Sequence, residues 1–512
     1  MTLRLGLLVD SSSVAAWVAQ LADRVSALNG VEITLLIDAG RSAADRPAIL
    51  DTYLNLERRF LHNIPDLTFS VNLHEKFPTI RIVSVEGVKE VELEQLDIVI
   101  SFQADSTYLP ARLGTWSWND ISATVGFREV LERTPLTTCA LFARLPNGRR
   151  MHIRRAVFAT DWFSAARNQN LVYLRASSIL IWALKKLILQ GEDEFFKLTE
   201  PQDPDILRSD VNNSYEVKIL GVAKLAWKQA GRALEKKFRP RETWLLFAGQ
   251  SRGGLIPAWT ATNPIVPPRG VYWADPMAVE RDDRTFLFVE EYVRAIRRGR
   301  IVCLTLDEEA HIVSNKVVLE RPYHLSYPFT FEYHGETYMI PETASKRAIE
   351  LYRCTHWPDA WEFIGTVMKD VYAVDTTLLQ HGRHWWLFAN LMTEKGSSSW
   401  DELHLFFSDD PLSSNWTPHP LNPIVSDARS ARPAGPFFTH NGILYRPSQD
   451  SSRRYGYALN LNRVDILTER DYAETLVEKI LPQAGYLATH TYSRTKNWVF
   501  MDSVTRKMGE AG

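Results

Sequence analysis

Four side chains that could act on one substrate recur at matching places in the second half of the chain. Asp275, Tyr327, Asp375 and Arg432 each open a copy of a repeat, and their spacing of about 50 residues is typical of propeller blades. Equivalent residues of successive blades converge on one end of the central channel. Carboxyl groups there can exchange protons with a substrate, and a guanidinium binds phosphate or carboxylate while keeping its own proton. The repeat therefore predicts a site for a substrate that carries an anionic group.

Each candidate residue has a hypothetical role. Asp275 would act as a base or hydrogen-bond the substrate, Asp375 would set its orientation and charge, and Glu342, at the end of a second strand, would donate a proton. The expected substrate-binding residues are Arg432 assisted by Arg429 or Arg446, together with Tyr327, Trp273, Tyr372 and His490. Structural alternatives stay open, because an Asp before Pro caps turns, a strand-end Glu pairs with Arg, and aromatic rings pack between blades.

Each repeat reads as a strand, a turn and a second strand. The four copies open at Asp275-Pro276, Tyr327-Pro328, Asp375-Thr376 and Arg432-Pro433, and their turns contain Arg281 to Arg284, His334-Gly335, His381-Gly382 and Asn441-Gly442. A fifth blade can be assembled from Thr243 to Ala248 together with Thr489 to Ser493 and Trp498 to Met501. Pairing the first and last strands removes the open edges of the array. Five blades are therefore expected, with four or six as alternatives.

The first half has a different pattern. Apolar runs from Leu3 to Val9, Val31 to Ile37 and Asp97 to Phe102 enclose a segment with helical spacing, Val14 to Leu28. This order predicts an open α/β sheet over residues 1 to about 130. The first strand is followed by Asp10-Ser11-Ser12-Ser13 instead of a glycine-rich phosphate loop, so we expect the serines to cap the next helix.

The composition of the segments predicts three parts: an α/β domain over 1–195, a helical linker over 196–240 and a propeller over 241–512. The α/β domain ends in an apolar helix, Ala176 to Leu189. The linker contains Glu200 to Ser214, which is rich in Pro, Asp and Asn, and a basic helix, Val217 to Lys237.

Charge and cysteine content exclude several classes of function. Lys and Arg number 59 and Asp and Glu 61, a formal net charge of −2, so no general basic field attracts nucleic acid. The sequence contains no stretch of about 18 apolar residues, so it predicts no transmembrane helix. Cys139, Cys303 and Cys354 lack disulfide or zinc spacing, and we expect buried thiols and a cytoplasmic protein. The histidines also lack metal spacing, so neither a metal nor a cofactor is expected.

Leu113-Gly114-Thr115-Trp116-Ser117-Trp118-Asn119 follows the strand that begins at Asp97. With the order of elements over roughly 1 to 190, this segment resembles the N-terminal domain of folate-dependent formyltransferases. Those enzymes use Asn-x-His after a strand and an Asp-Gly further along; here Ser117 and Asn119 take the first two places and Asn147-Gly148 the last. Serine and amide groups do not titrate near neutrality. The resemblance therefore implies a catalytically degenerate domain, and folate is not expected.

The propeller half also resembles a known family. The resemblance is carried by Ala274-Asp275-Pro276, Leu325-Ser326-Tyr327-Pro328-Phe329, Ile340-Pro341-Glu342-Thr343, Ile349-Glu350-Leu351-Tyr352, Val374-Asp375, Ala431-Arg432-Pro433-Ala434-Gly435 and Tyr445-Arg446-Pro447. These motifs resemble the domain named for the N-terminal part of glucosamine inositolphosphorylceramide transferase, itself similar to the five-bladed family 43 glycoside hydrolases. The family implies polysaccharide or glycolipid assembly. Asp275 and Asp375 match two Asp positions of the hydrolases, whereas Arg432 stands where their acidic Glu is expected.

The sequence thus predicts a formyltransferase-like α/β open sheet followed by an all-β five-bladed β-propeller. The leading functional hypothesis is a glycosyl or sugar-modifying transferase of surface polysaccharide or glycolipid biosynthesis. Its expected substrate is a sugar nucleotide or glycan, and its expected partners are glycan-assembly proteins rather than nucleic acid. The rival hypotheses are a glycoside hydrolase, a non-catalytic glycan-binding scaffold and, more remotely, retained formyl transfer.

Overall fold

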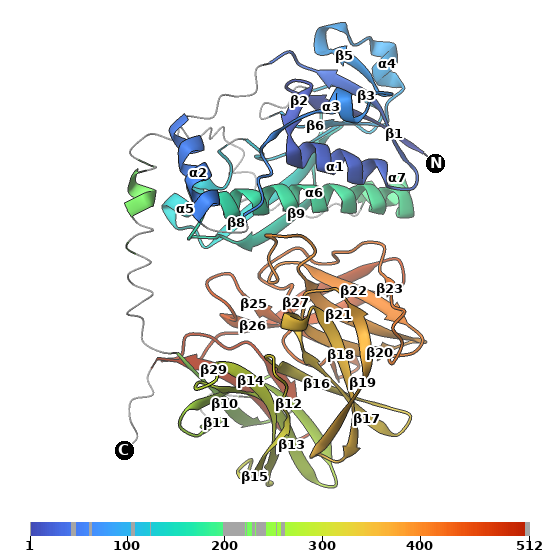
Figure 1. Ribbon diagram of the computed structural model, residues 1–512. Helices are drawn as coiled ribbons and strands as arrows, with labels where there is room; N and C mark the ends of the chain where they lie inside the picture. Colours follow the sequence, from blue (N-terminus) through green and yellow to red (C-terminus); the bar gives the residue numbers. More distant parts are fainter. Residues whose placement is uncertain are drawn as a thin grey trace. The chain divides into compact units, whose positions relative to one another are not determined.

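The chain forms two compact units in the computed structural model (Figure 1), one comprising Met1–Phe238 with Glu394–Ser397 and the other Arg239–Thr393 with Ser398–Gly512. The structure describes residues 2–506 except 42–47, 61–63, 104–107, 123, 198–220, 222, 228–230, 232–241, 252 and 258–261. The predicted linker segment Glu200 to Ser214 and most of the predicted helix from Val217 to Lys237 lie outside the described residues.

The first unit is built on a seven-stranded sheet with the order β5-β3-β1-β6-β7-β8-β9. Its first five strands are parallel, and β8 and β9 are added as an antiparallel hairpin. The predicted α/β open sheet is confirmed, and the hairpin extends it beyond residue 130. The strands are β1 (Leu3–Val9), β3 (Val31–Asp38), β5 (Arg81–Ser84), β6 (Ile98–Ser101), β7 (Thr115–Trp118), β8 (Leu136–Arg144) and β9 (Arg150–Ala159), with a separate pair β2 (Ser13–Ala15) and β4 (Ser70–Asn72).

Helices accompany this sheet, and the longest packs against β8 and β9. They are α1 (Ala16–Ser26), α2 (Ala48–Phe60), α3 (Leu73–Lys76), α4 (Glu90–Glu94), α5 (Phe127–Glu132), α6 (Ala165–Gln190) and α7 (Glu192–Lys197), with a 3₁₀ turn at Val85–Gly87. Helix α6 begins well before the expected Ala176. Its first turns are polar in sequence, yet the amides of Asn168 and Asn170 are buried and donate to the carbonyls of Gly126 and Pro65.

The serine-rich turn does not cap α1. The Ser13 hydroxyl contacts Ser70 in the paired strand β4. The first helical amides, those of Ala16 and Trp17, donate to the carbonyls of Phe69 and Leu67. The capping prediction was wrong because the backbone just before β4 supplies the acceptors that free helical N–H groups require.

The second unit consists of five four-stranded antiparallel sheets and confirms the five-bladed β-propeller (Figure 1). Blades 1 to 4 follow one another along the chain, each with its lowest-numbered strand innermost. Their strands are β12 (Val271–Arg281), β13 (Arg284–Val293), β14 (Arg298–Leu306) and β15 (Ile312–Leu319); β16 (Ser326–Tyr333), β17 (Glu336–Glu342), β18 (Ala348–His356) and β19 (Ala360–Lys369); β20 (Ala373–His381), β21 (His384–Leu391), β22 (Leu403–Ser408) and β23 (Thr417–Pro418); and β24 (Phe438–His440), β25 (Ile443–Asp450), β26 (Ala458–Leu467) and β27 (Tyr472–Ile480). A 3₁₀ turn spans Ala344–Lys346.

Blade 5 joins both ends of the propeller, as the sequence predicted. Its order is β11-β10-β29-β28, with β10 (Thr243–Gln250), β11 (Thr262–Ile265), β28 (Tyr492–Arg494) and β29 (Trp498–Thr505). Trp244 pairs with Val504 and Ala248 with Phe500 in the antiparallel ladder. The closing contact is therefore a row of backbone hydrogen bonds that satisfies both strand edges.

The first three repeat dipeptides lie inside the inner strands as β-bulges, whereas Arg432-Pro433 precedes β24. β12, β16 and β20 each shift register there against their second strands. Asp275, Tyr327 and Asp375 have positive φ angles of 54°, 44° and 52°. Non-glycine residues rarely adopt this region, and such strain concentrates at functional sites. In blade 4 the positive φ is instead at Gly435, 126°.

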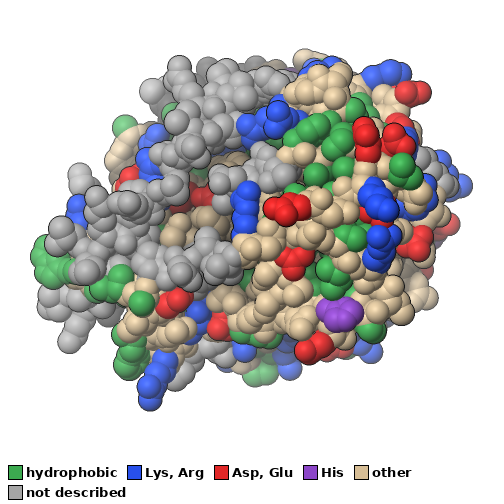
Figure 2. Space-filling view, turned by 90° about the horizontal axis from the view of Figure 1, so that it is seen from above, with side chains coloured by type: hydrophobic (Ala, Val, Ile, Leu, Met, Phe, Trp, Pro, Cys, Tyr) green, Lys and Arg blue, Asp and Glu red, His purple; other side chains and the backbone are tan. Residues whose placement is uncertain are grey.

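The chain carries three free cysteines, of which Cys139 and Cys303 are buried as expected and Cys354 is only half-buried. In the described part of the chain, no helix is long and apolar enough to cross a membrane. On the face displayed in Figure 2, acidic and basic side chains are interspersed with apolar ones.

Candidate active site

The structure gathers one predicted residue from each of the first four blades and His490 from blade 5. We call Asp275, Tyr327, Asp375, Arg432 and His490 the mouth ring; all five are buried. Asp275 Oδ2 accepts the backbone N–H of Tyr327 at 3.1 Å. Arg432 donates to both carboxylate oxygens of Asp375, from Nε to Oδ2 at 2.5 Å and from Nη2 to Oδ1 at 3.3 Å. The predicted convergence of these residues is thus seen directly in their contacts.

Tyr327 connects blade 2 to blades 3 and 4. Its hydroxyl lies 2.8 Å from Thr377 Oγ1 and accepts the backbone N–H of Gly435 at 2.8 Å. Because the phenol is fully buried and hydrogen-bonded on both sides, Tyr327 holds the inner strands together rather than presenting a ring to a sugar.

Asp502, on β29, is a member of this network that sequence reasoning missed. Its Oδ2 lies 2.6 Å from His490 Nδ1 and accepts the backbone N–H of Asp275 at 3.1 Å. Its Oδ1 accepts the N–H groups of His490 and Thr491 at 2.9 and 3.0 Å. His490 Nε2 in turn faces Asp275 Oδ1 at 3.5 Å. The closing blade therefore fixes both the backbone and the carboxylate of Asp275.

Like charges crowd this region. Among the residues that the structure describes, the region has two cations, Arg432 and His490. Its buried or nearly buried acids are more numerous: Asp275, Glu290, Glu342, Asp375 and Asp502. Burial raises the pKa of Asp275 to about 6, opposed by His490 and reinforced by the Asp375 charge. Burial and neighbouring carboxylates also raise the pKa of Glu290 and of Glu342 well above the ordinary range. Such groups hold protons where an exposed carboxyl has lost them.

His490 has the opposite tendency. Burial alone would lower the pKa of its imidazole, but the adjacent Asp502 carboxylate and the Asp275 charge raise it above the ordinary value. Trp244 stacks on the ring at a centroid distance of 4.1 Å. A charged imidazole between two carboxylates offsets part of the acid crowding.

Glu342, the predicted proton donor, lies within reach of the mouth ring. Its Oε2 accepts the backbone N–H of Asp375 at 3.3 Å and stands 3.8 Å from Arg432 Nη2. Tyr372 precedes β20 and is half-buried, and burial and the Glu342 charge raise the pKa of its phenol. Tyr455, which the sequence did not single out, stacks under the Arg432 guanidinium at 4.8 Å and is also half-buried. Trp244, Tyr372 and Tyr455 thus offer partly exposed aromatic surface beside the acids.

The structure places three predicted binding residues elsewhere. Trp273 is 1% exposed and its indole N–H donates to Glu291, so it packs in the core instead of stacking on a sugar. Arg446 is equally buried and pairs with Glu474 on the outer strand β27. Arg429 pairs with Asp427. These contacts contradict the predicted ligand roles, because the Trp273 indole N–H donates to Glu291 and each guanidinium is paired with a carboxylate.

Asp275, His490 and Asp502 are close enough to suggest a metal centre, since one ligand atom from each lies within 4.8 Å of the others. Their oxygens already accept hydrogen bonds: Thr491 Oγ1 donates to Asp275 Oδ1, and backbone N–H groups donate to the remaining oxygens. The trio is therefore a hydrogen-bonded network, and these bonds account for the close approach of its members without a metal ion.

The residues of the formyltransferase resemblance do not meet at one site in the first unit. Asn119 Oδ1 accepts the backbone N–H of Ala140 at 2.8 Å, so its amide completes the edge of β8. Asn147 lies in the exposed turn between β8 and β9, where it accepts the N–H of Arg149. The register of β7 with β8 puts Asn147 toward the opposite end of β7 from Ser117 and Asn119.

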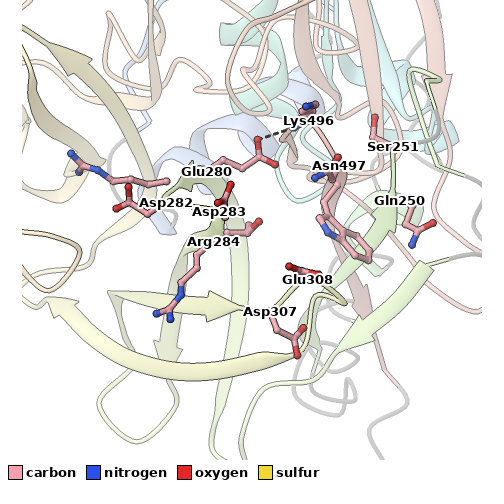
Figure 3. Close-up of a pocket in the computed structure, with 13 residues that line it drawn as sticks. Gln250, Ser251, Glu280, Asp282, Asp283, Arg284, Asp307, Glu308, Lys496 and Asn497 are labelled. Atoms are coloured by element: carbon pink, nitrogen blue, oxygen red, sulfur yellow. Dashed lines mark hydrogen bonds between the residues drawn. The ribbon is translucent and has the colours of Figure 1, made fainter.

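A cavity of about 840 Å³ lies at the turns joining the strands of blades 1 and 5. Figure 3 shows polar side chains around it, with the backbone N–H of Lys496 bonded to Glu280. β12 runs from Asp275 to these turns, so the cavity lies at the other end of the blade from the mouth ring. Its lining residues include Gln250, Glu280, Asp282, Asp283, Arg284, Asp307, Glu308 and Asn497.

Comparison with known proteins places the propeller half near one family. Residues 257–489 match the family model described as glucosamine inositolphosphorylceramide transferase 1, N-terminal. The chain is 36% identical over 247 residues to the Oryza sativa subsp. japonica protein of that name, covering 46% of this chain and 33% of the relative. The Arabidopsis thaliana protein of the same name is 31% identical over 231 residues, with 43% and 30% covered. The predicted resemblance of this half is confirmed, and the formyltransferase resemblance stays a prediction.

The chain spans about one third of the length of the curated relatives it matches, 33% and 30% of the two proteins. Among solved structures, a family 117 glycoside hydrolase produced by the marine bacterium Zobellia galactanivorans is similar with a TM-score of 0.35 and 10% identity, covering 53% of this chain and 93% of that protein.

Proposed function

We propose that the propeller is a carbohydrate-active domain that works in glycolipid or surface-glycan assembly by proton transfer at a sugar oxygen. The observation that carries this proposal is the group of buried carboxyls with raised pKa values around Asp275. Acid–base catalysis needs one group that keeps its proton and one that accepts a proton near the working pH. Asp275, with a pKa of about 6, suits the base. The buried glutamates beside it, Glu290 and Glu342, suit the acid.

The contacts of Arg432 argue against the anionic substrate that the sequence predicted for this site. The Arg432 guanidinium is already paired with Asp375 through two hydrogen bonds and covers Tyr455. A phosphate would have to displace that carboxylate inside an acid-rich site, at the cost of a buried ion pair. We therefore propose that the mouth ring holds a neutral or amino sugar, and that any phosphate of a donor lies outside the ring.

Transfer is the favoured reaction because the named relatives are glucosamine inositolphosphorylceramide transferases. The acceptor is then a lipid-linked or glycan hydroxyl, from which Asp275 removes the proton. Hydrolysis is the second candidate, since the same pair of acid and base would serve equally if water took the place of that hydroxyl.

The test is a screen of the full chain against nucleotide sugars and aryl glycosides, with and without glycolipid acceptors, for transferred and free sugar. Asp275→Asn should lower turnover about 10³-fold, within the range for loss of an acid–base group. Asp465→Asn, in an exposed pair with Arg463, is the matched control and should leave turnover unchanged. Free sugar alone would establish hydrolysis, and equal rates in Asp275→Asn and wild type would refute the mouth ring as the active site.

A further inference from the structure

Two glutamates occupy corresponding positions in neighbouring blades. Glu290, on the second strand of blade 1, pairs with Ala274 just before the bulge of β12. Glu342, on the second strand of blade 2, pairs with Ser326 just before the bulge of β16. The repeat thus places one carboxyl at the mouth from each of the two blades, and Glu290 and Glu342 differ only in their local partners.

Glu342 has partners suited to a carboxylate. Its Oε2 accepts the N–H of Asp375, and the Arg432 guanidinium stands 3.8 Å away. The Arg432 charge opposes the effect of burial on its pKa. Burial keeps the pKa of both glutamates raised, but the fixed Arg432 cation favours ionisation of Glu342 and not of Glu290, so Glu342 is the weaker candidate for the proton donor.

Glu290 lacks such a partner. It is 7% exposed, and none of the residues that the structure describes donates a hydrogen bond to its Oε1. The charges that act on it most strongly are all carboxylates, those of Asp275, Glu342, Asp502 and Asp375. A buried acceptor without a donor is costly when charged and much less so when the group carries a proton.

His324 is the nearest group of complementary character. Its Nδ1 accepts the backbone N–H of Gly299 at 2.9 Å, so the neutral imidazole carries its proton on Nε2. Nε2 faces Glu290 Oε1 at 3.5 Å. Burial lowers the pKa of His324, which favours this neutral form. The His324 side chain is 38% exposed and so stands between the buried acid and solvent.

We propose that Glu290, rather than Glu342, is the protonated acid of the mouth and that His324 is its positioning residue. On the proposed function, the acceptor oxygen, whose proton Asp275 removes, bonds to the sugar carbon as the bond from that carbon to the leaving oxygen breaks, and the Glu290 proton passes to the leaving oxygen. His324 Nε2–H then donates to the Glu290 carboxylate until solvent restores its proton. The protonation state itself does not rest on the proposed function.

The groups that face Glu290 and titrate with it come from several elements. Tyr272 and Asp275 lie on β12, His324 before β16, Glu342 on β17, Asp375 on β20 and Asp502 on β29. Because most of these groups are acids that lose charge together as the pH falls, variants of single residues are needed to assign the proton.

Infrared spectroscopy of the folded full chain tests the protonation state without a substrate. At neutral pH, wild type should show the C=O stretch of a protonated carboxyl, and Glu290→Gln should lose that component. Glu342→Gln is the matched control and should retain it. An unchanged band in Glu290→Gln would overturn the assignment. If that variant does not fold, titration of wild type decides: a band that disappears in the ordinary range of glutamate refutes the proposal.

The pH profile of turnover, on whichever sugar donor or aryl glycoside the screen identifies, tests the role of the pair. Glu290→Gln should lower turnover by about 10²- to 10⁴-fold and remove the alkaline limb. His324→Leu should move that limb to higher pH, because the carboxylate loses its donor, and His324→Gln should restore it. A normal limb in Glu290→Gln or His324→Leu would refute the assigned role. If Glu290→Gln loses the infrared band but wild type shows no turnover on any substrate, the assignment of the protonated acid stands and the proposed function is rejected.

Discussion

The strand ends of the first unit and the mouth of the propeller both collect polar side chains, but they use them differently. At the end of β3, the Asp38 carboxylate accepts the backbone N–H groups of Ser12 and Gly40. At the end of β7, Asn119 completes the edge of β8 through Ala140. These side chains serve the backbone, which accounts for their positions without a ligand.

At the mouth, Asp502 and Glu342 also accept backbone N–H groups, yet their charges lie next to other buried charges. Burial, reinforced by the neighbouring carboxylates, raises the pKa values of Asp275, Glu290 and Glu342. The comparison shows that satisfied hydrogen bonds do not distinguish acids with a structural role from acids with a functional role. Crowding of like charges distinguishes them, because it adds nothing to the stability of the fold.

The largest loss of stability should come from removing Arg432, the cation that compensates the crowded carboxylates. Arg432→Met leaves the buried Asp375 carboxylate uncompensated, and loss of one partner of a buried pair costs about 3 to 5 kcal/mol. Urea unfolding of the full chain, followed by circular dichroism, measures the loss. Arg463→Met, in an exposed pair, is the control and should cost less than about 1 kcal/mol. Equal losses in the two variants would remove the distinction between mouth and surface.

The sequence predicted the propeller fold more successfully than it predicted the contacts of individual side chains. Repeat spacing and turn residues were sufficient for five blades, because each blade is a local unit and equivalent residues must converge. The closing strands were also found, since an unpaired β edge demands a partner. The same convergence brought Asp275, Asp375, Arg432 and His490 together.

The partners of these residues could not be read from the sequence. Asp502 lies in the apolar run of β29, and only closure of the ring brings its carboxylate to the N–H of Asp275. Trp273 and Arg446 are residue types that bind sugars and anions, but burial and internal partners decide their role. Tyr455 gave no signal, because it lies in the loop between β25 and β26, and only folding of the blade brings it to Arg432 at the start of the same repeat.

A smaller effect is expected at the strand ends of the first unit. Asn119→Ala leaves the buried N–H of Ala140 without its acceptor, which costs about 1 to 3 kcal/mol. Asn147→Ala, in the exposed β8–β9 turn, is the control and should change stability by less than about 0.5 kcal/mol. Both are measured by urea unfolding. Neither variant should alter the infrared carboxyl band of the mouth; a change in that band would show that the two regions are not independent.

The smallest effect is a pH dependence that only the mouth should show. The pKa of His490 is raised in the folded state by Asp502 and Asp275, so folding favours the protonated imidazole. This contribution is fully present below the unfolded value of about 6.5 and is lost as the pH rises through the folded value. Melting temperatures of wild type and His490→Gln should therefore differ most at acid pH and converge above neutrality.

The exposed His311 supplies the control for this measurement, because its imidazole is 73% accessible and its neighbouring carboxylates, those of Asp307 and Glu309, are not buried. His311→Gln should follow the wild-type melting profile across the same pH range. If His490→Gln also runs parallel to wild type, the imidazole has the same pKa in the folded and unfolded protein, and the neighbouring carboxylates do not raise it. A wild type that loses stability relative to His490→Gln at acid pH would instead show that burial keeps the imidazole neutral. In either case, the pKa of Asp275, which burial raises from 3.8 to about 6, predicts that Asp275→Asn changes the profile within that acid range, which separates the contribution of this carboxyl from that of the imidazole.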